Sequence, residues 1–290
     1  MTVALAGEAP LIDVHAHFLH AGCGRRDWRE RNASRLRAGE RMGITCHVAS
    51  ILGSWGHRSP TYFPSPADVT LGNDEMLALQ EREGERVRSY VVVNPNHTGH
   101  AADEIRRAVA RGAVGVKLAA SRRADDALLD PIARLAADAG LPVLHHIWQH
   151  RRREWPGQEI SDGADLARLA RRHPATHFIL AHIGGGGDYA HTFAAVGDVP
   201  NILLDLSGSG VDRGMLDDAL AAVGAGRILW GADLTLCTGL AKLRALDVIG
   251  LDADAQHAVR WGNARRIFPP GSFPAADRFA ARATVGSGAA

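Results

Sequence analysis

Eight short apolar runs, separated by longer amphipathic segments, restrict the fold of this 290-residue sequence more than any other feature. Each run is rich in Val, Ile and Leu and has the length of a buried parallel strand. The runs cover residues 11–14, 44–52, 87–94, 114–118, 142–146, 177–182, 201–206 and 227–233. Strand and helix alternating eight times predict an α/β fold, a TIM (β/α)8 barrel in a single domain. The rival architecture, an open doubly wound sheet, would need a Gly-rich phosphate-binding turn after the first run, and none occurs there.

Helix signals occupy much of the sequence between the runs. The expected helices cover residues 73–86, 101–111, 128–139, 164–173 and 212–223. Asn73 is the expected N-cap of the first helix, and Gly112 and Gly140 follow the second and third as C-cap glycines. Residues 53–68 contain several prolines and are expected to form an extended loop over the carboxyl ends of the strands.

The barrel is expected to have two flanking segments. Residues 1–10 are interpreted as an N-terminal lead-in and residues 11–268 as the barrel. Residues 269–290 are rich in Ala, Gly and Pro, which predicts a flexible C-terminal tail.

Composition excludes several classes of protein. Hydrophobic residues make up 46% of the chain, which is enough for a large core. The formal net charge is +1 and no basic stripe occurs, so nucleic acid is not an expected partner. No run has the length of a membrane span, and the N-terminus lacks the regions of a secretion signal. The few, widely spaced cysteines indicate neither a disulfide framework nor a zinc module, so a cytoplasmic location is expected.

Residues able to bind a metal close several of the runs. His15 and His17 end the first run two positions apart, so their side chains share one side of a strand. His146 and Asp233 close the fifth and eighth runs. A barrel gathers the carboxyl ends of its strands into one ring, here called the mouth, where TIM-barrel enzymes carry out their chemistry. Three imidazoles and a carboxylate suit one divalent ion, with Zn²⁺ expected, although each residue alone could be a hydrogen-bonded core side chain.

Three neighbours of these candidates depend on strand alternation. His145 and His146 are adjacent, so one of the two must point away from the mouth. Asp13 lies two positions before His15 and is predicted to share its face and to accept a hydrogen bond from a ligand imidazole. Asp205 ends the seventh run and could line the mouth, although an ordinary strand-end carboxylate is the preferred interpretation.

Five short motifs occur in the order typical of a known group: IDVHAHF, PVLHH, FILAHIGG, ILWGADL and GNARRIF. Together, over residues 11–268, they resemble the amidohydrolase superfamily, in the amidohydrolase-related branch that includes aminocarboxymuconate semialdehyde decarboxylase. The resemblance implies that the metal ligands are His15, His17, His146 and Asp233. It also implies that His182, which closes the sixth run, lies beside the metal and handles protons.

Further site residues follow from the same comparison and from position. Lys117, in the sequence GVKL, matches a fourth-strand motif of the branch and is a candidate for substrate binding. Trp148 and His150 follow the fifth run and are predicted to wall the pocket, with ordinary loop packing as the alternative. Residues 151–153 are three arginines that could clamp a carboxylate or belong to a solvated loop. Residues 234–235 depart from the aromatic and Pro common in the branch, so the substrate of a relative does not transfer.

Three functions remain open. The first is a metal-dependent hydrolase of a small-molecule ester, lactone or amide, with a metal-activated water, Asp233 accepting its proton and His182 serving the leaving group. The alternative is a metal-dependent decarboxylase, a lyase, acting on an aromatic or muconate-type acid. The third is a non-catalytic barrel. The expected partner is a small-molecule substrate, and the resemblance implies a homodimer.

Overall fold

The computed structural model describes residues 10–147, 160–183, 188–208, 213–234 and 236–274. Eight parallel strands form one sheet in the order β1 to β8. They are β1 Leu11–His17, β2 Ile44–Ser50, β3 Val87–Val93, β4 Gly115–Leu118, β5 Val143–His145, β6 Phe178–Leu180, β7 Ile202–Asp205 and β8 Ile228–Leu229. An isolated bridge from Ala16 to Asp233 brings the last strand back to the first. The predicted TIM barrel is confirmed.

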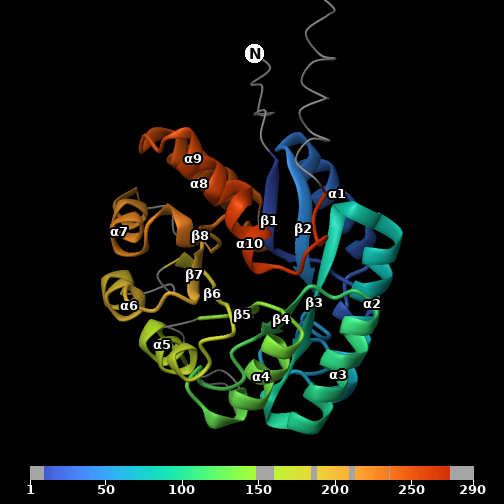
Figure 1. The fold of residues 1–290 in the computed structure, drawn as a ribbon. Coiled ribbons are helices and arrows are strands. Elements are labelled where there is room, and N and C mark those ends of the chain that lie inside the picture. Colours follow the sequence, from blue (N-terminus) through green and yellow to red (C-terminus); the bar gives the residue numbers. More distant parts are fainter. Residues whose placement is uncertain (1–9, 148–159, 184–187, 209–212, 235, 275–290) are drawn as a thin grey trace, which may run out of the picture.

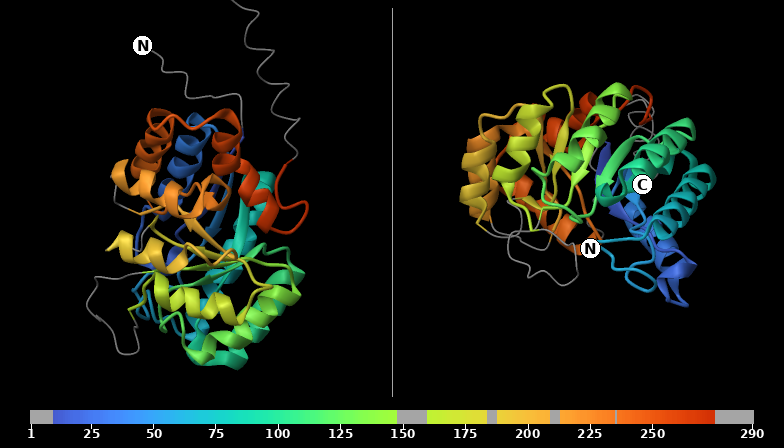
Figure 2. Two further views of the ribbon diagram at one scale, coloured as in Figure 1. Left: turned by 60° about the vertical axis from the view of Figure 1, so that its left-hand side comes forward. Right: turned by 90° about the horizontal axis from the view of Figure 1, so that it is seen from below.

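Helices follow the strands, and most of them lie outside the ring (Figures 1 and 2). They are α1 Trp28–Arg41, α2 Pro66–Glu83, α3 Thr98–Ala110, α4 Asp130–Asp138, α5 Gly163–Arg172, α6 Tyr189–Val196, α7 Arg213–Val223, α8 Leu236–Val248, α9 Ala253–His257 and α10 Asn263–Ile267. Each helix expected from the sequence overlaps one of them. Among the described residues, no helix is both long and apolar enough to cross a membrane.

The predicted start of the first expected helix, which corresponds to α2, is wrong. Ser65 caps α2, its Oγ accepting a hydrogen bond from the main-chain N of Asp68 at 3.2 Å, and Pro66 occupies the first turn. Asn73 instead lies buried inside the helix, where its side-chain amide pairs with both the N and the O of Val92 on β3. An Asn that fits a capping pattern can therefore serve as a link between helix and strand.

Apolar side chains fill the inside of the barrel. They include Ile12, Val14, Cys46, Val48, Tyr90, Leu144, Ile179, Leu203 and Leu229. Aromatic rings complete this core: Phe268 lies 6.0 Å from the ring of Tyr90, and Phe273 lies 5.3 Å from that of Phe268. Of the predicted tail, residues 269–274 are described, and Phe273 within them is buried.

An irregularity in β1 breaks the alternation of its side chains between the two faces of the strand. Ile12 and Val14 pack inside the barrel, whereas Ala16 packs on the helix side with residues of α1 and α2. The pairing of β1 with β2 shifts register between Asp13 and Ala16. As a result His15 points into the mouth while Asp13 points toward the helices, so the prediction that the two share a face is wrong.

Candidate metal centre and active site

Three of the predicted ligands meet at the mouth. His15 and His17 end β1, and Asp233 lies shortly after β8. The Nε2 atoms of the two histidines are 3.2 Å apart, and Oδ1 of Asp233 lies 3.3 Å from that of His17 and 3.8 Å from that of His15. Ligand atoms around a tetrahedral zinc ion are separated by about 3.4 Å. Within the described residues, these three make a donor group of the size that one divalent ion requires.

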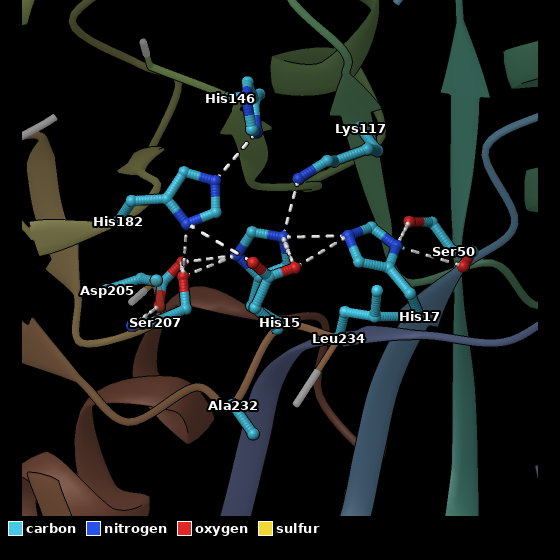
Figure 3. A network of polar contacts seen from close by, with 12 residues as sticks. His15, His17, Ser50, Lys117, His146, His182, Asp205, Ser207, Ala232 and Leu234 are labelled. Atoms are coloured by element: carbon cyan, nitrogen blue, oxygen red, sulfur yellow. Dashed lines mark hydrogen bonds and ion pairs between the residues drawn. The ribbon is translucent and has the colours of Figure 1, made fainter. Parts of the chain in front are cut away.

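In both imidazoles Nδ1, the ring nitrogen outside the donor group, lies within hydrogen-bond distance of a side-chain oxygen (Figure 3). Nδ1 of His15 lies 2.7 Å from Oδ2 of Asp205, and Nδ1 of His17 lies 3.0 Å from Oγ of Ser50. Such partners fix the tautomer and the ring orientation, which leaves each Nε2 lone pair for a metal. The donor set therefore fits a divalent ion.

Asp205 thus has the role that the sequence suggested for Asp13. Its approach to His15 needs the missing side chain at Gly231, where a Cβ would lie 2.6 Å from Oδ1 of Asp205 and 3.0 Å from Cβ of His15. The Gly of the sequence ILWGADL is therefore explained by the contact between His15 and Asp205.

Lys117 reaches the same centre from β4. Its Nζ lies 2.8 Å from Nε2 of His15, and the side chain is buried. Burial lowers the pKa of Lys117 to about 7, although the carboxylates of Asp233 and Asp205 oppose this shift. The structure places this candidate residue directly beside the three-residue donor group.

His146 and His182 form a pair on the opposite side of the mouth. Nδ1 of His146 lies 2.8 Å from Nε2 of His182, and Nδ1 of His182 lies 3.8 Å from Oδ2 of Asp233. His182 therefore lies between His146 and the donor group. The role of His146 as a fourth ligand stays a prediction.

The register of the fifth strand agrees with the choice of His146 over His145. Leu144 packs inside the barrel and Val143 packs outside it. His145 is buried, and its Nδ1 donates to the main-chain O of His146 at 2.9 Å. Alternation along the strand places His146, not His145, on the side of the mouth.

Burial sets the protonation of this cluster. It lowers the pKa of His182 to about 3 in spite of the nearby Asp233 and lowers that of His15 well below its usual range, with the charge of Lys117 acting in the same direction. For Asp233, burial opposes ionisation, but the hydrogen bond from His17 and the neighbouring imidazoles outweigh it and hold the pKa well below its usual range. Neutral imidazoles beside an ionised carboxylate are the forms that bind a metal.

The hydroxyl of Ser207 joins the two sides of the mouth. Its Oγ lies 2.9 Å from Nδ1 of His15 and 3.0 Å from Nδ1 of His182, and it also donates to Asp205. Buried Lys242 holds the main chain at this point through the carbonyl of Ser207 at 2.7 Å. Sequence reasoning missed Ser207, Lys242 and Ser50, because no motif marks a residue whose partner lies on another strand.

Strained backbone collects at the carboxyl ends of the strands. Four described residues other than glycine have positive φ: Trp55, Ala120, His182 and Asp233. They follow β2, β4, β6 and β8 in turn. Residues held in this region concentrate at functional sites, because the surrounding structure must enforce the conformation.

A cavity of about 730 Å³ opens beside the donor group. Apolar and cationic side chains share its lining: Leu19, Trp55, Leu234 and Leu236 with Arg25, Arg31 and Arg35. His17 lines it too, and the Trp55 ring packs edge-on against the His17 ring at 5.3 Å. Trp148 and His150, predicted to wall the pocket, lie outside the described residues, as do residues 151–153.

Comparisons with known proteins identify the family and the fold. A family model described as amidohydrolase matches residues 12–269. No curated protein matches the chain. Among solved structures, 5-carboxyvanillate decarboxylase from Sphingomonas paucimobilis is similar with a TM-score of 0.67 at 16% identity, covering 90% of this chain and 99% of that one.

Two further solved structures are similar to a comparable extent. 2,6-Dihydroxybenzoate decarboxylase from Rhizobium has a TM-score of 0.68 at 16% identity, covering 89% of this chain and 98% of its own. Dihydroxybenzoic acid decarboxylase from a Polaromonas species, solved with bound manganese and 2-nitroresorcinol, has a TM-score of 0.67 at 18% identity, covering 89% and 96%. These likenesses establish the shared fold. Because the family match runs from the first strand past the last helix, the protein belongs to the amidohydrolase family.

Proposed function

We propose that the protein is a metal-dependent decarboxylase of an aromatic acid. The observation that carries the proposal is the opening of an apolar, arginine-lined cavity at His17, directly beside the three-residue donor group. This reaction was the alternative interpretation of the sequence. The similar solved structures named above are decarboxylases of aromatic acids, whereas the hydrolase interpretation has support only at the level of the family.

The two parts of the site suit the two parts of such a substrate. A flat ring gains free energy by leaving water for contact with Trp55, Leu19 and Leu234. Oxygen substituents would be directed toward the ion held by His15, His17 and Asp233. Arg25 and Arg31 both pair with Asp27, and Arg35 pairs with Asp13, so three guanidinium groups face two carboxylates and the remaining positive charge favours an acid over a neutral ester, lactone or amide.

Decarboxylation exchanges a carboxylate for a proton at one ring carbon. The carbon–carboxylate bond breaks, its electron pair stays on the ring, CO₂ leaves, and a proton takes up that pair. A bound divalent ion supplies an electrophilic centre for the substrate's oxygens. Asp233 approaches both His17, which lines the cavity, and His182, so we assign to Asp233 and His182 the relay of a proton from water to the ring carbon, with Lys117 holding an oxygen of the substrate.

We propose one divalent ion at the centre. Two imidazoles and a carboxylate suit Zn²⁺, the ion expected from the sequence, and also Mn²⁺, which is present in the Polaromonas relative. We further propose His146 as the fourth protein ligand.

The experiment that tests this function begins with the metal content of the purified protein. Zn²⁺-loaded and Mn²⁺-loaded enzyme would then be offered hydroxybenzoates, carboxylated methoxyphenols, lactones and amides. Release of CO₂ with formation of the decarboxylated arene is the expected result. Hydrolysis of a lactone or amide without CO₂ release from any acid would replace this proposal with the hydrolase interpretation. Absence of turnover together with absence of bound metal would favour a non-catalytic barrel.

A further inference from the structure

A buried carboxylate lies behind the metal centre, on the helix-facing side of β1. The side chain of Asp13 is fully buried, and its Oδ2 accepts hydrogen bonds from Nη2 of Arg35 at 2.9 Å and Nδ1 of His47 at 2.8 Å. Arg35 comes from α1 and His47 from β2. The helix passes so close that a Cβ at Gly39 would lie 2.5 Å from Nε2 of His47. Three elements therefore enclose the carboxylate.

The second oxygen of this carboxylate holds the main chain that carries the metal ligands. Oδ1 of Asp13 accepts from the main-chain N of His15 at 3.3 Å and from that of Ala232 at 2.9 Å. His15 is itself a ligand, and Ala232 directly precedes Asp233. One carboxylate thus joins the ligand-bearing end of β1 to the segment after β8.

Arg35 ties down the other side of Asp233. Its Nη1 donates to the main-chain O of Leu234 at 3.1 Å. β8 ends at Leu229, so regular strand pairing does not extend to this segment. Asp233 donates its own N–H to the carbonyl of His15 at 2.6 Å and has a φ of 58°. A left-handed aspartate is held only where its surroundings fix it, and here the main chain of both flanking residues, Ala232 and Leu234, is bonded to one buried ion pair.

We propose that Asp13 and Arg35 are positioning residues that set the distance between the imidazoles of β1 and the carboxylate of Asp233. The Asp13 carboxylate acts through the main chain, from the face of β1 opposite the ligand imidazoles. An ion pair with all its strong acceptor sites used has a fixed geometry and is costly to break, which suits it to hold a site in place before metal arrives. The inference depends on the metal centre and not on the identity of the reaction.

The test is the metal affinity of Asp13→Asn, which keeps the size of the side chain and removes its charge. Affinities for Zn²⁺ and Mn²⁺ would be measured by competition with a chelating dye, well below the melting temperature. We expect Asp13→Asn to weaken metal binding by about tenfold, the lower end of the range seen when a ligand loses an outer partner. The visible spectrum of the Co²⁺-loaded variant should also change, because it reports the arrangement of the ligands.

The chain offers a matched control in Glu104. This buried carboxylate on α3, the helix between β3 and β4, accepts hydrogen bonds from Arg107, Asn73 and Thr70. Glu104→Gln should lower the melting temperature in the same way as Asp13→Asn but leave the metal affinity and the Co²⁺ spectrum unchanged. Equal changes of affinity in both variants would mean that Asp13 is merely structural and would overturn the proposal.

A second pair of variants keeps the test decisive if Asp13→Asn does not fold. His47→Asn retains a donor near Oδ2 of Asp13, and Arg35→Lys retains the charge but cannot span both Asp13 and the carbonyl of Leu234. We expect Arg35→Lys to weaken metal binding and His47→Asn to preserve most of it. Wild-type affinity in Arg35→Lys would also overturn the proposal. Failure of the decarboxylase assay would leave these measurements intact, since none requires a substrate.

Discussion

The two sides of the barrel mouth use histidine differently. On the β1 side, His15 and His17 each bond an oxygen partner through Nδ1 and turn Nε2 toward a common centre. On the β5 and β6 side, His146 and His182 bond each other. Imidazoles whose Nδ1 bonds an oxygen partner suit a metal at Nε2, whereas in the hydrogen-bonded pair His182 suits the transfer of a proton and His146 is the proposed fourth ligand. The comparison teaches that the outer partner of a histidine, more than its place at a strand end, indicates its role.

The largest effect is expected from replacing His146, on the β5 and β6 side of the mouth. As the proposed fourth ligand, its replacement in His146→Ala should remove the metal and with it all turnover. His145→Ala, the adjacent control, should keep the metal, because His145 faces away from the mouth. Metal content by mass spectrometry decides the outcome. Retention of metal with loss of turnover in His146→Ala would make the second side a proton relay only.

Like Ser207, Asp233 connects the two sides of the mouth. Its Oδ1 lies 3.3 Å from Nε2 of His17 and its Oδ2 lies 3.8 Å from Nδ1 of His182. Asp233→Asn should lower kcat by about 10²- to 10⁴-fold, the usual share of a general acid or base, and weaken metal binding less. Asn also tolerates the positive φ at this position better than Ala, so the variant should fold. Steady-state kinetics on the metal-loaded protein measure the change. Turnover near that of the wild type would remove Asp233 from proton transfer.

The anchoring partners of the first side should have intermediate effects. Asp205→Asn is expected to weaken metal binding by about 10- to 100-fold, since it replaces the acceptor that orients His15. Ser50→Ala should weaken it less, because the main-chain O of Ser50 still lies 3.3 Å from Nδ1 of His17. Dye competition on both variants gives the comparison. An Asp205→Asn protein that binds metal as tightly as Ser50→Ala would contradict the role assigned to this carboxylate.

The last expected effect concerns stability, and it is small at neutral pH. Burial lowers the pKa of His145 to about 4, and a hydrogen bond to the carbonyl of His146 only partly opposes this. The unfolded chain therefore binds a proton at this residue before the folded chain does, so the contribution of His145 to stability falls as pH drops from about 6.5 to about 4, by up to about 1.4 kcal/mol per pH unit. Denaturant unfolding of metal-free protein should show a shallower pH dependence in His145→Gln. An unchanged slope would mean that His145 takes up its proton equally in both states.

The sequence was sufficient to predict the barrel, because each strand is a short apolar run and longer amphipathic segments separate the runs. It also predicted three side chains that meet, since the carboxyl ends of parallel strands share one rim. The partners of those side chains were not predictable. The register shift in β1 reverses the face of Asp13 relative to His15, and Asp205 takes its place across the barrel. Such contacts depend on how the barrel closes, which no local pattern records.

The aromatic rings of Tyr90, Phe268 and Phe273, which complete the core inside the barrel, have a consequence for how reactants and products enter and leave. Because side chains fill the inside of the barrel, reactants and products must both pass through the mouth, at the carboxyl ends of the strands. In the proposed reaction, CO₂ and the arene product would both leave through the mouth. An arene that has not yet left would compete with the next acid for the cavity.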